Sequence, residues 1–138
     1  MKNKLILVDS DAFVALAKED DANHRKAVKQ LRSLIDEQAN FITSNYVFSE
    51  TVTVISIRIS HKAATDFIKR IKSTQSPFPI RRLDEELEEK AIEVFKGQAS
   101  KNTSFVDCTN ITLFRELKVD AIFSFDGIYK KNGLTTVE

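Results

Sequence analysis

The chain of 138 residues has no tryptophan, one cysteine, two histidines and three glycines. A single Cys108 excludes an internal disulfide and is typical of a reducing compartment. No paired-cysteine zinc spacing and no Gly-rich phosphate loop is present, which excludes two common kinds of site. No apolar run approaches the ~20 residues that span a bilayer, and Met1–Lys4 leads into an apolar run instead of a signal peptide. We therefore expect a cytoplasmic protein without membrane contact.

Composition predicts one globular domain over residues 1–138, because 42% of the residues are hydrophobic and 30% are charged. The net charge of +1 indicates no class of partner, but the charges are unevenly distributed. Seven Lys or Arg lie between Arg58 and Arg82 against one acid, and six acids lie between Asp84 and Glu93 against one lysine. The basic segment could contact phosphates, although a solvated helix face is the alternative.

Short apolar runs alternate with amphipathic stretches along the chain. The runs predict strands at Leu5–Val8, Phe41–Thr43, Ile80–Leu83 and Ala121–Phe125. The segment Thr51–Ile59 is ambiguous, because its β-branched residues locally favour a strand. Strands separated by helices indicate an α/β protein, a three-layer α/β/α sandwich with a central parallel sheet of four or five strands.

Four acids from distant segments each lie inside an apolar run or at the end of one: Asp9, Glu50, Asp107 and Asp126. Carboxylates are costly to bury unless something positive compensates them. In parallel sheets, ligands bind at the carboxyl ends of the strands, which is where Asp9 and Asp126 fall. The pattern therefore predicts one acidic pocket that holds a hard divalent cation, with Mg²⁺ or Mn²⁺ as the expected ion.

Each acid also has a structural explanation. Asp9 could cap the helix that follows it, and Asp107 lies three residues after Ser104, the spacing of a capping box. Asp126 precedes a glycine, an ordinary turn dipeptide. Glu50 is harder to explain structurally, because a helix would place it on an apolar face.

Four short segments in this order carry a resemblance to a known family: Val8–Leu16, Ser49–Glu50, Ser104–Cys108 and Phe123–Tyr129. They resemble the PIN-domain ribonucleases and, within them, the VapC-type toxins of prokaryotic toxin–antitoxin pairs. The similarity runs through nearly the whole chain. It implies a PIN-like fold in which Thr51–Ile59 is helical, against the local preference for a strand.

The resemblance also implies roles for individual residues. The acids Asp9, Glu50, Asp107 and Asp126 would form the metal site. We expect direct metal contacts from Asp9 and Asp107, while Asp126 would hold a second ion or orient the water. Glu50 would act through a bound water. The hydroxyls of Ser10 and Ser124 would support these ligands.

Two departures from the family pattern concern the surroundings of the site. Asp11 stands where the family more often has a small neutral polar residue, so it adds a fifth carboxylate or only caps the helix. Gly127 stands where many relatives carry a charge. Lys130 and Lys131 lie close to Asp126 in sequence, and we expect them to contact RNA.

The expected function is that of a metal-dependent endoribonuclease that is the toxin of a toxin–antitoxin pair. An aspartate-dependent phosphatase is an alternative, because Asp9-Ser10-Asp11 after an apolar strand also matches that chemistry. A catalytically inactive PIN module that only binds is another. The expected partners are RNA, a cognate antitoxin and a second copy of the chain. Tyr46–Ile59 and Ala64–Ile71 would be the contact surfaces, unless their apolar residues belong to the core.

Overall fold

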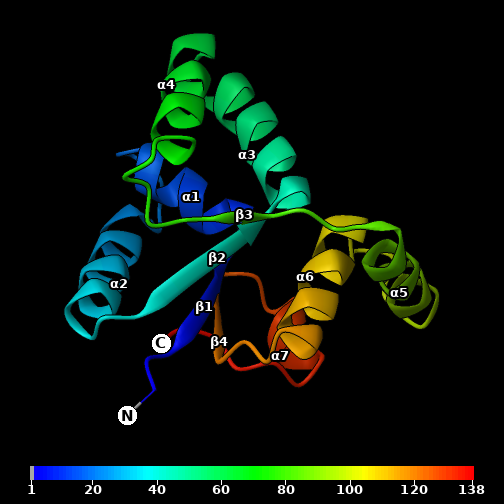
Figure 1. Cartoon of the computed structure of the whole chain (residues 1–138). Coiled ribbons are helices and arrows are strands. Elements are labelled where there is room, and N and C mark those ends of the chain that lie inside the picture. Colours follow the sequence, from blue (N-terminus) through cyan, green and yellow to red (C-terminus); the bar gives the residue numbers. More distant parts are fainter. Residues whose placement is uncertain (1) are drawn as a thin grey trace.

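The computed structural model describes residues 2–138 and has one parallel sheet between two layers of helices (Figure 1). Its strands are β1 (Leu5–Val8), β2 (Asn40–Ser44), β3 (Ile80–Arg81) and β4 (Ala121–Phe123). They lie in the order β3-β2-β1-β4 and pair in parallel. On central β1, Leu7 is opposite Ile42 on one neighbour and Ile122 on the other. The predicted α/β/α sandwich is confirmed, with four strands.

Alternation along β1 divides the core into two parts. Ile6 and Val8 point into one cluster, and Leu7 points into the other. The first cluster is covered by α1 (Ser10–Ala17), α2 (His24–Asp36), α3 (Asn45–Arg58) and α4 (His61–Ile71). The second is covered by α5 (Glu85–Lys96), α6 (Phe105–Glu116) and α7 (Ile128–Lys131).

Several helices begin at a side chain that accepts a hydrogen bond from the backbone. The Ser44 side chain accepts from the Val47 N–H, and the Asp84 side chain accepts from the Leu87 N–H. Ser104 caps α6 in the same way, and the side chain of Asp107 accepts from the Ser104 N–H, which completes a capping box. These polar residues therefore set where the helices start, and the predicted capping box is confirmed.

The local preference of Thr51–Ile59 for a strand is wrong, because this segment continues α3 as a helix. The helix places Val47, Thr51 and Ile55 on one buried face at intervals of four residues. The Thr51 hydroxyl donates to the Val47 carbonyl at 2.7 Å, so its burial leaves no donor unpaired. Tertiary burial has overridden the propensity of β-branched residues.

Two predicted strands are shorter than expected. β3 ends at Arg81, and the Leu83 N–H instead donates to the Asn45 side chain at 2.9 Å. β4 ends at Phe123, and the Phe125 N–H donates to the Asp11 carboxylate at 2.8 Å. In both places a side chain from another element takes the backbone donor beyond the strand, which apolar patterning does not reveal.

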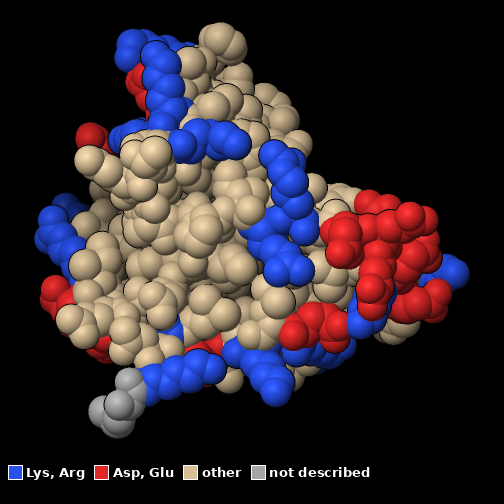
Figure 2. Space-filling view, viewed as in Figure 1, with Lys and Arg blue, Asp and Glu red and all other residues tan. Residues whose placement is uncertain are grey.

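The surface separates charges of opposite sign. Figure 2 shows acidic side chains gathered over α5, with Lys and Arg over α4 and along the middle of the same face.

Ile55, a predicted contact residue, lies in the core, whereas Ile57 is 79% exposed and Ile59 is 39% exposed. Within residues 2–138, no helix is both long and apolar enough to cross a membrane.

Candidate active site

The acids meet where neighbouring parallel strands end. Asp9 directly follows β1 and is the N-cap residue of α1, and its N–H still donates to the Phe123 carbonyl of β4 at 3.1 Å, which holds its side chain at the strand edge. Ser124 directly follows the adjacent β4. α6 brings Asp107 to the same place from its first turn, and both carboxylates are almost inaccessible to solvent.

The Asp9 carboxylate accepts four hydrogen bonds and is 4% exposed. Its Oδ1 accepts from the Ser10 N–H at 2.8 Å and from the Asn110 amide at 3.0 Å. Its Oδ2 accepts from the Tyr129 hydroxyl at 2.8 Å and from the Ser124 hydroxyl at 3.1 Å. Two oxygens with four donors use the full acceptor capacity of a carboxylate, so the orientation of Asp9 is closely defined.

Two hydroxyls link Asp9 to the neighbouring acids. The Ser124 hydroxyl lies 3.1 Å from both Asp9 Oδ2 and Asp11 Oδ2. The Tyr129 hydroxyl lies 2.8 Å from Asp9 Oδ2 and 3.2 Å from Asp107 Oδ1. Each hydroxyl carries one proton and donates to one carboxylate at a time. The three carboxylates therefore form one network: Ser124 links Asp9 with Asp11, and Tyr129 links Asp9 with Asp107.

Burial dominates the electrostatics of this network. Burial, followed by the charge of Asp11, raises the pKa of Asp9 from its ordinary 3.8 to about 7, although hydrogen bonds from Tyr129 and Ser10 lower it. Burial also raises the pKa of Asp107, and the charge of Asp126 adds to this rise. No ion pair formed within residues 2–138 involves these acids. The pocket therefore holds negative charge that no Lys or Arg neutralises.

Asp11 is a fifth acid of the site and not the cap of α1. Its Oδ2 accepts from the Phe125 N–H at 2.8 Å and from Ser124, which ties α1 to the chain that leaves β4. Its Oδ1 is buried and has no donor within residues 2–138. Burial raises the pKa of Asp11, and the charge of Asp126 adds to the rise. Asp11 thus increases the negative charge that the site must accommodate.

Glu50 and Asp126 lie at the rim. Glu50 is half-buried on α3 and its Oε1 accepts a hydrogen bond from the Ser10 hydroxyl. Asp126 is exposed, and its Oδ1 accepts from the Ile128 N–H at 3.0 Å, as a turn residue does. Within residues 2–138, Ser10 is the one hydrogen-bonded link between Glu50 and the buried network, so the structure joins Asp9, Asp11 and Asp107 more directly than the predicted four.

Asn110 and Tyr129 were not predicted as site residues. Both are completely buried, and the Asn110 amide donates to the Tyr129 hydroxyl at 2.9 Å as well as to Asp9. A signal for Asn110 was present, because a residue three positions after Asp107 shares its helix face. Tyr129 lies within the last segment of the family resemblance, but its contact with both carboxylates depends on the placement of α7.

The donor set suits a hard divalent cation, since it consists of carboxylate, amide and hydroxyl oxygens. Asp11 Oδ1 and Asn110 Oδ1 are buried acceptors without a donor in the described part of the chain. Across residues 2–138, no three His, Cys, Asp or Glu side chains already converge on one point that could hold a metal ion. The residues present therefore fit Mg²⁺ or Mn²⁺ in chemistry and charge, and their side chains must reorient to share an ion.

The two lysines that follow Tyr129 on α7, Lys130 and Lys131, differ in their surroundings. Lys130 lies 3.2 Å from the Glu138 carboxylate, so its charge is partly engaged by the end of the chain. Lys131 is exposed on α7. An exposed ion pair of this kind contributes little energy, so Lys130 can exchange Glu138 for another anion.

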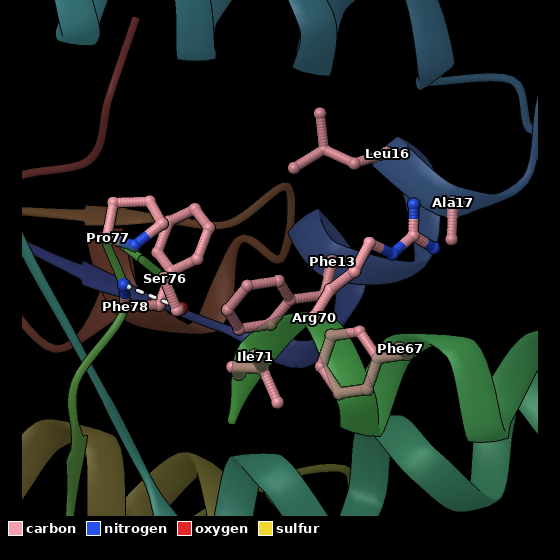
Figure 3. Close-up of a pocket in the computed structure, with 9 residues that line it drawn as sticks. All are labelled: Phe13, Leu16, Ala17, Phe67, Arg70, Ile71, Ser76, Pro77 and Phe78. Carbon is pink, nitrogen blue, oxygen red and sulfur yellow. Dashed lines mark hydrogen bonds between the residues drawn. The ribbon is translucent and has the colours of Figure 1, made fainter. Parts of the chain in front are cut away.

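A separate hollow of about 300 Å³ lies between α1, α4 and the segment before β3 (Figure 3). Phe13, Phe67 and Phe78 form its aromatic wall, and the Phe13 ring contacts the other two edge-on. Arg70 is its one charged lining residue in the described chain. This hollow contains no carboxylate, so it is a candidate docking surface and not a second catalytic site.

The fold and the acidic strand edge define a nuclease-like α/β domain, and the family is established by comparison. The model of the PIN domain family matches residues 6–133, which is nearly the whole chain. The chain belongs to the PIN-domain family.

The curated relatives include the 23S rRNA-specific endonuclease VapC20 from two strains of Mycobacterium tuberculosis. Each is 29% identical to this chain over 133 residues, which cover 96% of this chain and 98% of the relative. The crystal structure of M. tuberculosis VapC20, described as a toxin that cleaves the sarcin–ricin loop, superposes with a TM-score of 0.86 at 28% identity. That alignment covers 96% of this chain and 98% of the solved one.

Proposed function

We propose that this protein is a metal-dependent endoribonuclease that hydrolyses phosphodiester bonds in RNA. The observation that carries the proposal is the buried Asp9 carboxylate, linked through hydroxyls to Asp11 and Asp107 without a cationic side chain. Uncompensated buried carboxylates at the carboxyl ends of parallel strands are suited to hold a divalent cation. Membership of the PIN-domain family and the activity named for VapC20 support the same function.

In this proposal Asp9 and Asp107 would hold Mg²⁺ or Mn²⁺ directly, with Asp126 at the rim and Glu50 acting through a water. The cation would act as a Lewis acid that lowers the pKa of a bound water and neutralises the charge that develops on the phosphate. Asn110 and the Ser10 N–H fix one oxygen of Asp9.

The other side chains position and complete the site. Tyr129 is fully buried, and its hydroxyl fixes the positions of the Asp9 and Asp107 carboxylates relative to each other. Ser124 keeps Asp11 against the chain that leaves β4. Asp126 is exposed at the rim, where it would hold a second ion or orient the attacking water.

The test is cleavage of single-stranded or looped RNA, beginning with ribosomal RNA because the relatives act on it. Excess EDTA should abolish cleavage, Mg²⁺ or Mn²⁺ should restore it, and Asp9→Asn should remove it. Asp36→Asn is the matched control, because it removes the same charge from an exposed position on α2. Cleavage that continues unchanged in excess EDTA would refute the proposed mechanism.

The phosphatase alternative needs Asp9 as a free nucleophile. That mechanism leaves Glu50 and Asp107 without a role, although Ser10 and Tyr129 link them to the same group of acids. A phosphate-monoester assay beside the RNA assay separates the two activities. An inactive binding module would instead retain RNA binding without cleavage under any metal.

We propose further that the protein is a cytoplasmic toxin whose antitoxin fills the apolar hollow of Figure 3. Phe67 and Arg70 line this hollow on α4, which is one of the two predicted contact segments. Together they suit an antitoxin segment in which an apolar side chain stands next to an acidic one. Expression alone should slow growth, and co-expression of a cognate antitoxin should restore it. Arg70→Glu should weaken the rescue and leave the growth defect, because Arg70 is exposed whereas Phe67 belongs to the core.

A homodimer contact at the end of α3 is proposed from two exposed isoleucines. Ile57 is 79% exposed and Ile59 is 39% exposed, and the two lie two residues apart where α3 ends. Light scattering should give a dimer for the natural chain and a monomer for Ile57→Asp. A natural chain that remains monomeric at high concentration would refute this contact.

A further inference from the structure

A pocket of about 310 Å³ opens on the Glu50 side of the acidic site, and Asp11 of the buried network is part of its lining. α1 and α3 form two of its walls, and the loop before α2 forms the third. Its lining residues are Ser10, Asp11, Val14, Asp21, Asn23, Glu50, Val54 and Arg58. The volume lies at the lower end of the roughly 300–1,000 Å³ that small-molecule sites occupy, so the pocket suits a ligand of about the size of one nucleotide.

Arg58 is the cationic lining residue of this pocket in the described chain. It lies on the same face of α3 as Glu50 and Val54, at intervals of four residues. Within residues 2–138 it forms no ion pair, and its side chain is exposed. Eight residues of helix separate it from Glu50 by about 12 Å, so it can reach a phosphate next to the one at the acids. A guanidinium binds phosphate through two parallel hydrogen bonds.

The opposite wall presents one acceptor and one amide. Asp21 Oδ1 accepts from the Asn23 N–H at 2.8 Å, which leaves Asp21 Oδ2 available. No hydrogen bond within the described residues engages the Asn23 side-chain amide. A carboxylate accepts from an exocyclic amino group, and an amide N–H donates to a ring nitrogen. Adenine and cytosine carry an amino group beside such a nitrogen, whereas uracil has no amino group.

We propose that this pocket binds one nucleotide of the RNA that neighbours the scissile phosphate. Arg58 binds its phosphate, and Asp21 with Asn23 selects adenine or cytosine over uracil. The inference rests on the proposed ribonuclease function and adds to it a subsite with a base preference. Because Arg58 binds the phosphate and Asp21 with Asn23 binds the base, free nucleotides should occupy the pocket without any metal.

The test is an NMR titration of the ¹⁵N-labelled full chain in EDTA with CMP, AMP, UMP and inorganic phosphate. CMP and AMP should perturb the Asn23 amide and the Arg58 Nε–H, and should bind about fivefold more tightly than UMP. Arg58→Ala should weaken CMP binding about tenfold, and Arg58→Lys should weaken it less. Arg32→Ala is the matched control, because it removes an exposed charge from α2 and should change nothing.

Asn23→Ala keeps the backbone N–H that Asp21 accepts, so the loop remains intact. It should abolish the preference of CMP over UMP and keep most of the phosphate-dependent affinity. The inference is overturned if the perturbed residues lie elsewhere, if Arg58→Ala behaves as Arg32→Ala does, or if UMP binds as well as CMP to the natural chain. RNA cleavage without nucleotide binding refutes this subsite only, whereas nucleotide binding without any RNA cleavage refutes the proposed ribonuclease function.

Discussion

The Asp9 carboxylate should destabilise the metal-free fold at neutral pH, so Asp9→Asn should stabilise it. Burial raises the pKa of Asp9 from 3.8 to about 7. The folded state then binds the proton more tightly than the unfolded state, and the free energy of unfolding falls as the pH rises from about 4 to about 7. At about 1.36 kcal/mol for each pH unit, the loss is on the order of 4 kcal/mol. It is absent below pH 3.8 and constant above pH 7.

An asparagine fits the same hydrogen bonds. Its carbonyl oxygen can accept from the two N–H groups that Asp9 Oδ1 accepts from. Its NH₂ group then faces the hydroxyls of Ser124 and Tyr129, which can accept from it. Each hydroxyl can turn its own proton to a second carboxylate, Asp11 at 3.1 Å or Asp107 at 3.2 Å. The substitution therefore removes a charge and leaves no donor unpaired.

Urea unfolding in EDTA measures the effect. At about pH 8, Asp9→Asn should raise the free energy of unfolding by about 2–4 kcal/mol, and the gain should vanish towards about pH 4. Added Mn²⁺ should stabilise the natural chain and not the variant. Asp36→Asn should change stability by less than about 0.5 kcal/mol. An Asp9→Asn protein less stable than the natural chain at about pH 8, with an unchanged denaturant slope, would refute the reasoning.

Three further outcomes follow from the same contacts. Tyr129→Phe should lower the free energy of unfolding by about 1–3 kcal/mol, because Asn110 and two carboxylates lose a partner; an unchanged urea midpoint would contradict this. Asp107→Asn should remove RNA cleavage and stabilise the metal-free protein less than Asp9→Asn, because its capping-box bond to Ser104 already favours the charged form. Cys108 is buried and its pKa is raised, so a thiol reagent should modify it only after unfolding.

The arrangement of layers could be predicted because it depends on periodicity. Apolar runs separated by amphipathic stretches allow few topologies other than a parallel sheet with helices on both faces. The helix that contains Thr51 could not be predicted from local propensity, because its β-branched residues are helical only where tertiary packing holds them. The resemblance to the family corrected that segment, whereas propensity alone gave the wrong answer.

The acids of the site could be found from sequence because each interrupts an apolar run, and the structure brings Asp9, Asp11 and Asp107 into one network. That these acids are metal ligands stays a prediction. The partners of Asp9 could not be found in the same way. Asn110 and Tyr129 reach it only because α6 and α7 pack over the same end of the sheet, and no local pattern encodes that approach.

The hydroxyl-bridged network is costly in the metal-free state. A core selected for stability alone would not keep three carboxylates among Tyr129, Ser124 and Asn110, because neutral side chains of similar shape satisfy the same donors. Local rules of stability are broken where function requires it. The raised pKa values of Asp9, Asp11 and Asp107 thus mark the place where this fold gives up stability. A divalent cation would recover that loss, which is why metal binding and folding stability should be linked in this protein.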